Sequence, residues 1–253
     1  LDELFRQAAD FYVVHYSCQS FYDNPGGASR RVTSLAVLNV GSNQTISYSI
    51  HQVAERKGRK ISLDDIHDHY DELEKVMLGE FYEFVGAHPN AKWLHWNMRD
   101  ANYGFEAIAH RFRVLGGKPI TIPSSHLYDL ASALVDIYGN EYARHGEFGR
   151  LDTLINLNGI TSTGFLSGKE EAEAFENREF VRLHQSTLRK VRVIHTIARS
   201  EWDRGLSVDA GWWERHGASL AGLVDSITDH WGYKLAGGLA MVGGLIALGR
   251  GLL

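Results

Sequence analysis

The chain has 253 residues, of which 44% are hydrophobic and 23% charged, so wholesale disorder is excluded and a sizeable core is available. Its formal net charge of −5 argues against a generally basic nucleic-acid coat, although a local basic groove would still fit. The only cysteine, Cys18, cannot form an internal disulfide, and this favours a reducing, cytoplasmic compartment.

Three stretches with the character of β-strands open the chain. Residues 11–17 read FYVVHYS, residues 30–40 read RRVTSLAVLNV, and residues 45–53 read TISYSIHQV. Turn-forming residues separate them, with YDNPGG in the first interval and GSNQ in the second. Short turns between successive strands predict an antiparallel meander.

The hydrophobic period then changes to that of helices. Between residues 62 and 85, apolar side chains recur every three or four positions, which predicts an amphipathic helix. The short apolar run KWLHW at 92–96 predicts a fourth strand. A further helix is predicted over residues 100–115, and it should end at Gly116 and Gly117.

Helices dominate the second half of the chain up to residue 200. Ser167 is expected to cap one of them, with Glu170 and Glu171 in its first turn, and this charged stretch is typical of a solvated helix. The predicted helices cover residues 125–138, 147–158, 168–176 and 178–200.

The order of these elements resembles an RNase H-like fold. A three-strand antiparallel meander is followed by a helix, by a strand parallel to the first, and then by helices. Over roughly residues 11–200, the layout also resembles the DEDD family of 3′–5′ exonucleases. This resemblance implies an α/β domain with a mixed sheet flanked by helices, which we expect over residues 1–205. In active members four carboxylates hold two divalent cations, Mg²⁺ or Mn²⁺.

The DEDD family places an Asp-x-Glu pair on its first strand. In this chain the corresponding positions hold His15 and Ser17, and Gln19, an amide isostere of glutamate, comes two residues later. The alternative is that His15 and Ser17 are polar groups satisfied within a half-buried strand. A nucleophile–base pair of Cys18 and His15 is disfavoured, because residues three apart on a strand point to opposite faces.

The segment LHWNMRDANYGF, at 94–105, matches the family better. His95 followed by Asp100 resembles the second motif, and Asn97 and Asn102 are close enough to assist. These polar groups cluster where a strand gives way to a helix, which is a usual ligand-facing position.

Later positions depart from the family pattern. Asp129 resembles the next acidic position and His184 the late histidine, but Arg189 stands where the family has its last aspartate, and Lys190 follows it. Only Asp100 of the four carboxylates survives this comparison. Histidine and arginine in place of acids make the pocket less negative, so it would suit an anion such as a phosphate or nucleotide better than two cations.

These comparisons predict one pocket that is faced by His15, Asn97, Asp100 and His184. If the protein is an enzyme, the catalytic residues would be His15, Asp100 and His184, and any metal ligands would be Asp100 and Asp129. The predicted ligand-binding residues are Ser17, Gln19, His95, Asn97, Asn102, Arg189 and Lys190.

Residues 206–253 are expected to form a separate helical segment. Within it, LAGGLAMVGGLIALGRGLL at 235–253 carries no charge before Arg250, although this uncharged run is shorter than the ~20 residues that span a bilayer. Glycine at this density disfavours a soluble helix, and small residues let membrane helices pack closely. We expect this tail to enter a membrane or to self-associate; a buried core helix is the alternative.

The sequence as a whole predicts a domain that recognises a nucleic acid or nucleotide and is coupled to a membrane-active helix, in a homo-oligomer or larger complex. Bacterial anti-phage defence, which often joins a sensor to a membrane effector, is a natural setting by analogy. One alternative is an active metal-dependent 3′–5′ nuclease or phosphodiesterase with atypical ligands. Another is an oligomer-forming structural membrane protein. Three or more converging acids would favour the enzyme.

Overall fold

A computed structural model describes residues 2–19, 29–58, 63–99, 102–146 and 149–209. The chain divides into two compact units, one formed by Leu1–Ala133 with Ala143–Val208 and the other by Leu134–Tyr142 with Asp209–Leu253. In the described part, no helix combines the length and the apolar character needed to cross a bilayer. The predicted tail helix at 235–253 lies outside the described residues.

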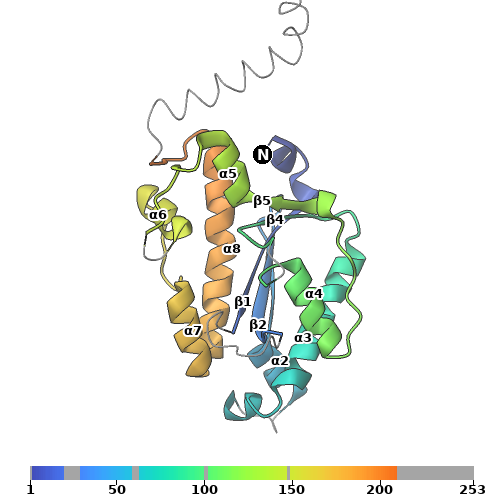
Figure 1. Ribbon diagram of the computed structural model, residues 1–253. Helices are drawn as coiled ribbons and strands as arrows, with labels where there is room; N and C mark the ends of the chain where they lie inside the picture. Colours follow the sequence, from blue (N-terminus) through green and yellow to red (C-terminus); the bar gives the residue numbers. More distant parts are fainter. Residues whose placement is uncertain (1, 20–28, 59–62, 100–101, 147–148, 210–253) are drawn as a thin grey trace, which may run out of the picture. The chain divides into compact units, whose positions relative to one another are not determined.

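A five-stranded mixed sheet forms the first unit, with the strand order β3-β2-β1-β4-β5 (Figure 1). The first three strands pair antiparallel, and β4 runs parallel to both β1 and β5. The predicted meander and the parallel fourth strand are therefore confirmed, and the arrangement is compatible with an RNase H-like fold. The strands are β1 (Phe11–Cys18), β2 (Val32–Asn39), β3 (Thr45–Ser49), β4 (Lys92–His95) and β5 (Leu127–Asp129).

Helices flank this sheet, with α3 and α4 on one side and α7 and α8 on the other (Figure 1). Three short 3₁₀ turns complete the described elements, at Ala8–Asp10, Leu63–Ile66 and Ser124–His126. The α-helices are α1 (Asp2–Arg6), α2 (Ile50–Lys57), α3 (Tyr70–Ala87), α4 (Phe105–Val114), α5 (Leu130–Tyr138), α6 (Arg150–Leu157), α7 (Gly168–Glu176) and α8 (Phe180–Trp202).

The two faces of β1 carry different chemistry. On one face the ring of Tyr12 contacts Phe84 of α3, with 5.4 Å between centroids. On the other face Ser17 Oγ lies 2.8 Å from Thr187 Oγ1 of α8. The alternation follows from the two-residue period of a strand, which places His15 on the same face as Ser17.

Two predicted elements need correction. The strand predicted over 45–53 ends at Ser49, and α2 begins at Ile50, because the buried residues Ile50, Val53 and Ala54 have helical spacing. The helix predicted over 125–138 contains β5 before α5, since residues Leu127–Asp129 pair with β4. A three-residue strand is too short to show a period of its own.

Two predicted helix ends agree with the structure, namely the Ser167 cap of α7 and the glycine end of α4. At the start of α7, Glu170 N–H donates to Ser167 Oγ at 3.3 Å, and Ser167 N–H donates back to Glu170 Oε2 at 2.8 Å. At the end of α4, Gly116 has φ +75°, and Gly117 N–H donates to the carbonyl of Phe112 at 2.8 Å. The starts of α3 and α4 come later than predicted, at Tyr70 and Phe105.

Candidate functional site

A buried polar network connects β1, α7 and α8. Ser17 Oγ donates to Glu171 Oε1 at 2.9 Å, and Ser186 Oγ donates to the same oxygen at 2.9 Å. Lys190 Nζ lies 2.7 Å from this oxygen, so the carboxylate is ion-paired as well as hydrogen-bonded. The oxygen of Thr187 lies 2.8 Å from Ser17 Oγ and links the network further to β2. The members belong to β1, β2, α7 and α8, on the face of the sheet that α8 covers, which we call the α8 face.

Lys190 is the only cation that an ion pair brings to this network in the described structure. It is 6% exposed, and its ammonium also lies over the ring of Phe165, 5.2 Å from the centroid. A buried carboxylate requires a compensating positive charge, and here an ammonium group of the same chain supplies it. The negative charge of Glu171 is therefore compensated within the chain itself.

His15 lies beside this network and is 7% exposed. Its Nδ1 is 3.3 Å from the hydroxyl of Tyr103, while its Nε2 is buried with no hydrogen-bond partner in the described part of the chain. Burial, and to a smaller extent the charge of Lys190, lowers the pKa of His15 well below its usual value. His15 is consequently a neutral imidazole at physiological pH and offers no positive charge to an anion.

A second group of polar side chains lies where β4 and β5 end. Asp129 accepts a hydrogen bond from the backbone N–H of Asn97 at 3.0 Å and another from Arg99 Nη1 at 2.7 Å. His95 pairs in register with Asp129, and its ring packs against Phe105 of α4 at 5.8 Å. The carboxyl ends of parallel strands are the usual ligand-facing edge of an α/β sheet.

His95 is neutral in this position. Burial lowers its pKa to about 4, although the neighbouring charge of Asp129 acts in the opposite direction. Its Nδ1 accepts a hydrogen bond from the backbone N–H of Met98 at 3.2 Å, so the ring proton lies on Nε2. The 3.9 Å separation between Nδ1 and Asp129 Oδ1 is therefore not an ion pair at neutral pH.

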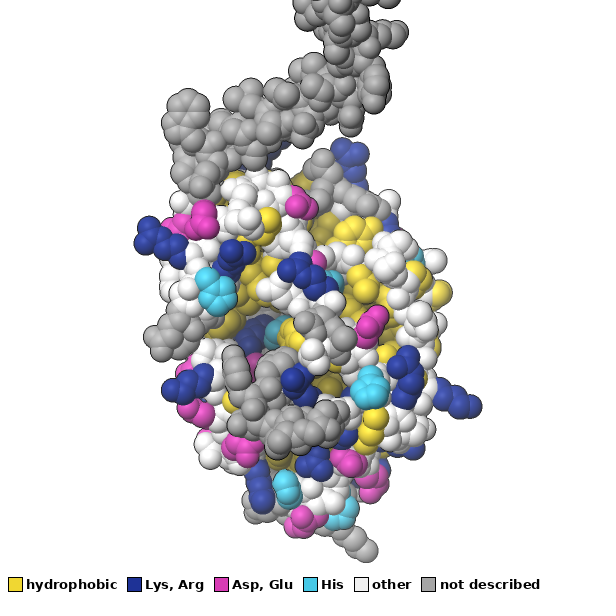
Figure 2. Space-filling model, viewed as in Figure 1, with side chains coloured by type: hydrophobic (Ala, Val, Ile, Leu, Met, Phe, Trp, Pro, Cys, Tyr) yellow, Lys and Arg dark blue, Asp and Glu magenta, His cyan; other side chains and the backbone are white. Residues whose placement is uncertain are grey.

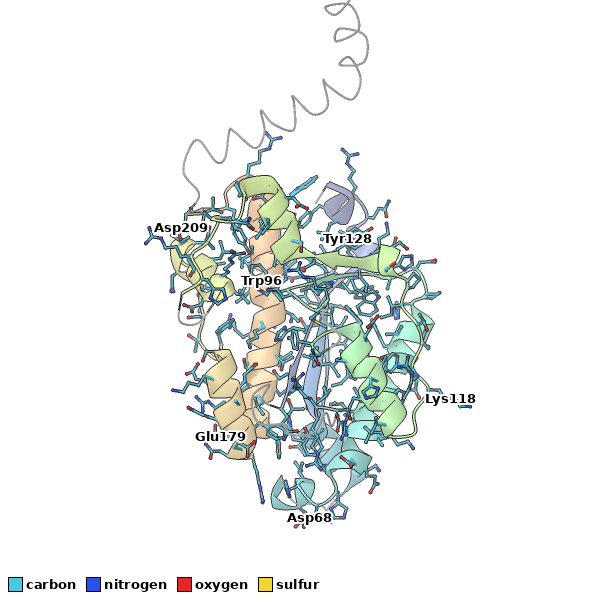
Figure 3. All side chains as sticks on the ribbon, viewed as in Figure 1. Asp68, Trp96, Lys118, Tyr128, Glu179 and Asp209 are labelled. Carbon is cyan, nitrogen blue, oxygen red and sulfur yellow. The ribbon has the colours of Figure 1, made fainter. Side chains whose placement is uncertain are left out.

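Two adjoining cavities open on this side of the sheet. The smaller, of about 330 Å³, includes His95, Arg99 and Asp129 in its wall. The larger, of about 560 Å³, lies between α4 and the segment that connects α4 to β5; Lys118 in this segment and Tyr128 in β5 are labelled in Figure 3. Both are of the size that small-molecule sites have.

The structure distributes the predicted site residues over several places. His184 packs against His51 of α2, with 5.0 Å between ring centroids, and Arg189 Nε donates to the carbonyl of Thr163 at 2.9 Å. The backbone N–H of Gln19 donates to the carbonyl of Arg31, and the carbonyl of Asn102 accepts from Arg30 Nη1. The α8 face holds His15, Ser17 and Lys190, and the ends of β4 and β5 hold His95, Asn97 and Asp129.

His15, Asn97 and His184 have different nearest partners, namely Tyr103, Asp129 and His51. That they face one pocket stays a prediction. Asp100 lies outside the described residues, so its part in a site stays a prediction. Over the ranges that the structure describes, no three His, Cys, Asp or Glu side chains form a group that could hold a metal ion.

Comparisons with known proteins add no assignment. No protein-family model and no curated protein sequence matches the chain.

We expect the free energy of unfolding to fall as the pH is lowered from about 6.5 to 4. Burial lowers the pKa of five histidines, so below pH 6.5 the unfolded chain binds protons that the folded chain does not. For His184, whose pKa falls to about 4, the loss is at most about 3 kcal/mol. Glu74 opposes this trend, because burial raises its pKa to about 7. The histidines are His15, His51, His95, His184 and His195.

Urea denaturation at several pH values measures this effect. His184→Gln should reduce the slope of stability against pH, whereas His67→Gln, at an exposed position, should leave it unchanged. A stability that stays constant between pH 6.5 and 4.5 would contradict the expectation.

Proposed function

We propose that this chain is an RNase H-like domain that recognises a nucleotide or nucleic acid without hydrolysing it. The observation that carries the proposal is the ion pair of Lys190 with Glu171, which is hydrogen-bonded to Ser17. By resemblance to the DEDD exonucleases, Ser17 stands where those enzymes have a metal-binding glutamate. A carboxylate already compensated by an internal ammonium is a poor ligand for a further cation, which supports binding over metal-dependent hydrolysis.

An exposed arginine supports the anionic character of the ligand. Arg99 donates to Asp129 through Nη1, yet 60% of its side chain remains accessible at the ends of β4 and β5. Its remaining N–H groups can form the paired hydrogen bonds that suit a phosphate. The position agrees with the edge at which α/β sheets bind ligands.

The second half of the proposal concerns the tail at 235–253, whose composition favours a membrane or another copy of the chain. Ligand binding by the domain would be transmitted to this tail, as in the sensor–effector arrangement of anti-phage defence. This half places the protein in the cytoplasm at a membrane, as a homo-oligomer or part of a larger complex.

A binding experiment in the absence of divalent cations tests the proposal. The full chain is titrated in EDTA into fluorescent nucleotides and into labelled single-stranded DNA and RNA, and the same substrates are then incubated with Mg²⁺ or Mn²⁺. We expect saturable binding in EDTA and no hydrolysis, and flotation with liposomes should carry the chain with the lipid. Hydrolysis by the native chain would instead favour the nuclease, with Gln19→Glu as the variant that restores an acid. If no probe binds, the proposal that the chain recognises a nucleotide or nucleic acid is rejected.

A further inference from the structure

We propose that the two cavities beside α4 form one site for a nucleoside 5′-monophosphate. This inference rests on the proposed function and names the ligand and its place. Four residues line both cavities, so the two spaces adjoin. They are Phe105, Glu106, Ser124 and Leu127. The site therefore runs from the ends of β4 and β5 along α4.

The larger compartment has the chemistry of a base-binding site. Its wall includes the aromatic residues Tyr82 and Phe105 and the aliphatic residues Ala109, Ile120 and Ile122. Flat aromatic surfaces bind nucleobases by stacking, and Phe105 offers such a surface, since the ring of Tyr82 is already stacked against Phe112 with 5.1 Å between centroids. The ring of Phe105 is itself fixed by an edge contact with Trp93 at 6.1 Å.

The boundary between the compartments is polar. Glu106 and Ser124 line both, and neither side chain has a hydrogen-bond partner in the described part of the chain. A carboxylate accepts hydrogen bonds only, while a hydroxyl both donates and accepts. The two hydroxyl groups of a ribose match this pair, since each can donate to the carboxylate.

The smaller compartment can hold a phosphate at Arg99. The carboxylate of Asp129 is already satisfied, because four donors of the chain bind it. Two are backbone N–H groups, of Asn97 and Ala131, and the others are Arg99 and Ser132. The carboxylate therefore orients Arg99, and the exposed N–H groups of the guanidinium can point to a ligand.

The charge distribution favours a single nucleotide over a polynucleotide. Glu106 and Asp129 lie in the same walls as Arg99, so a second phosphate close by would meet a carboxylate. On the face shown in Figure 2, the described Lys and Arg side chains are interspersed with Asp and Glu and form no continuous stripe. A nucleic-acid backbone is bound by an extended row of cations.

Calorimetric titration of the full chain tests the site. The ligands are the four nucleoside 5′-monophosphates, the matching nucleosides and inorganic phosphate. Thr121→Trp should fill the mouth of the larger compartment and abolish binding, and Lys118→Trp, in the same loop but outside the wall, should not. Arg99→Gln should lower the affinity for the monophosphates about 10–100-fold and leave the affinity for the nucleosides unchanged. Arg113→Gln, in the wall of the larger compartment, tests the alternative position for the phosphate, and Arg182→Gln, outside both walls, is the matched control.

The outcomes separate this inference from the proposed function. Nucleotide binding that survives Thr121→Trp, or inorganic phosphate binding as tightly as the monophosphates, would overturn the site while leaving recognition intact. A loss at Arg113→Gln in place of Arg99→Gln would overturn the assignment of the phosphate. Absence of binding by the unaltered chain to any nucleotide or oligonucleotide would reject both proposals together.

Discussion

Replacing Arg111 by methionine is expected to lower the free energy of unfolding by about 3–5 kcal/mol at pH 8. Its guanidinium donates through Nε and Nη2 to both oxygens of Glu74, at 2.6–3.0 Å, and Glu74 of α3 is fully buried. Without Arg111, the carboxylate of Glu74 would keep one hydrogen bond from the backbone N–H of Val32, at 2.6 Å. It would lose the positive charge that Arg111 supplies. Chemical denaturation measures the loss.

The pH dependence of this loss identifies its cause. Burial already raises the pKa of Glu74 to about 7, and removing Arg111 should raise it further. A carboxyl whose folded pKa is raised stabilises the fold at low pH and loses that contribution as the pH rises. The difference between Arg111→Met and the native chain should therefore shrink when the pH falls from 8 to 5.

Two further variants control for lost packing. Arg111→Met combined with Glu74→Gln should recover part of the stability, because it removes the unpaired charge. Arg182→Met breaks an exposed pair with Glu179 and should leave the free energy of unfolding nearly unchanged. Equal losses at Arg182 and Arg111 would contradict a special role for the buried pair.

Short-range patterns in the sequence were sufficient for the centre of the fold. Apolar runs separated by turn-forming residues predict the three-strand meander, and the helical crossover predicts a parallel fourth strand, as the structure confirms. The short strand β5 carried no such pattern. Its three residues become a strand only because β4 offers an edge for them.

The candidate site was less predictable because its members depend on which helix face meets the sheet. The family comparison selected His184 and Arg189, but residues five apart on a helix do not share a face. Thr187 and Lys190 are three apart and lie together on the buried face of α8. That face was visible in the spacing of Leu183, Val191 and Ile194.

Glu171 could not have been found in this way. It belongs to a charged stretch that indicates a solvated helix, and only the packing of α7 against α8 buries its carboxylate. The α4 cavities were equally hidden, since their walls come from α3, α4 and a loop that no local pattern connects.

Replacing Lys190 by methionine is expected to lower the free energy of unfolding by about 3 kcal/mol. The side chain of Glu171 is 13% exposed and would keep its hydrogen bonds from Ser17 and Ser186. These two donors and the residual solvent contact place the expected loss at the lower end of the range for a broken buried pair. Thermal and urea denaturation of the full chain measure it.

The neighbouring residue provides a matched control. Arg189 is also basic and lies on the same helix, but its Nε donates to the carbonyl of Thr163 at an exposed position. Arg189→Met should therefore cost less than about 1 kcal/mol. Combining Lys190→Met with Glu171→Gln should recover stability, because the amide can still accept from the two serines without a buried charge. If the double variant is no more stable than Lys190→Met alone, the charge of Glu171 does not require Lys190. The ion pair would then no longer explain why Glu171 should be a poor ligand for a metal cation.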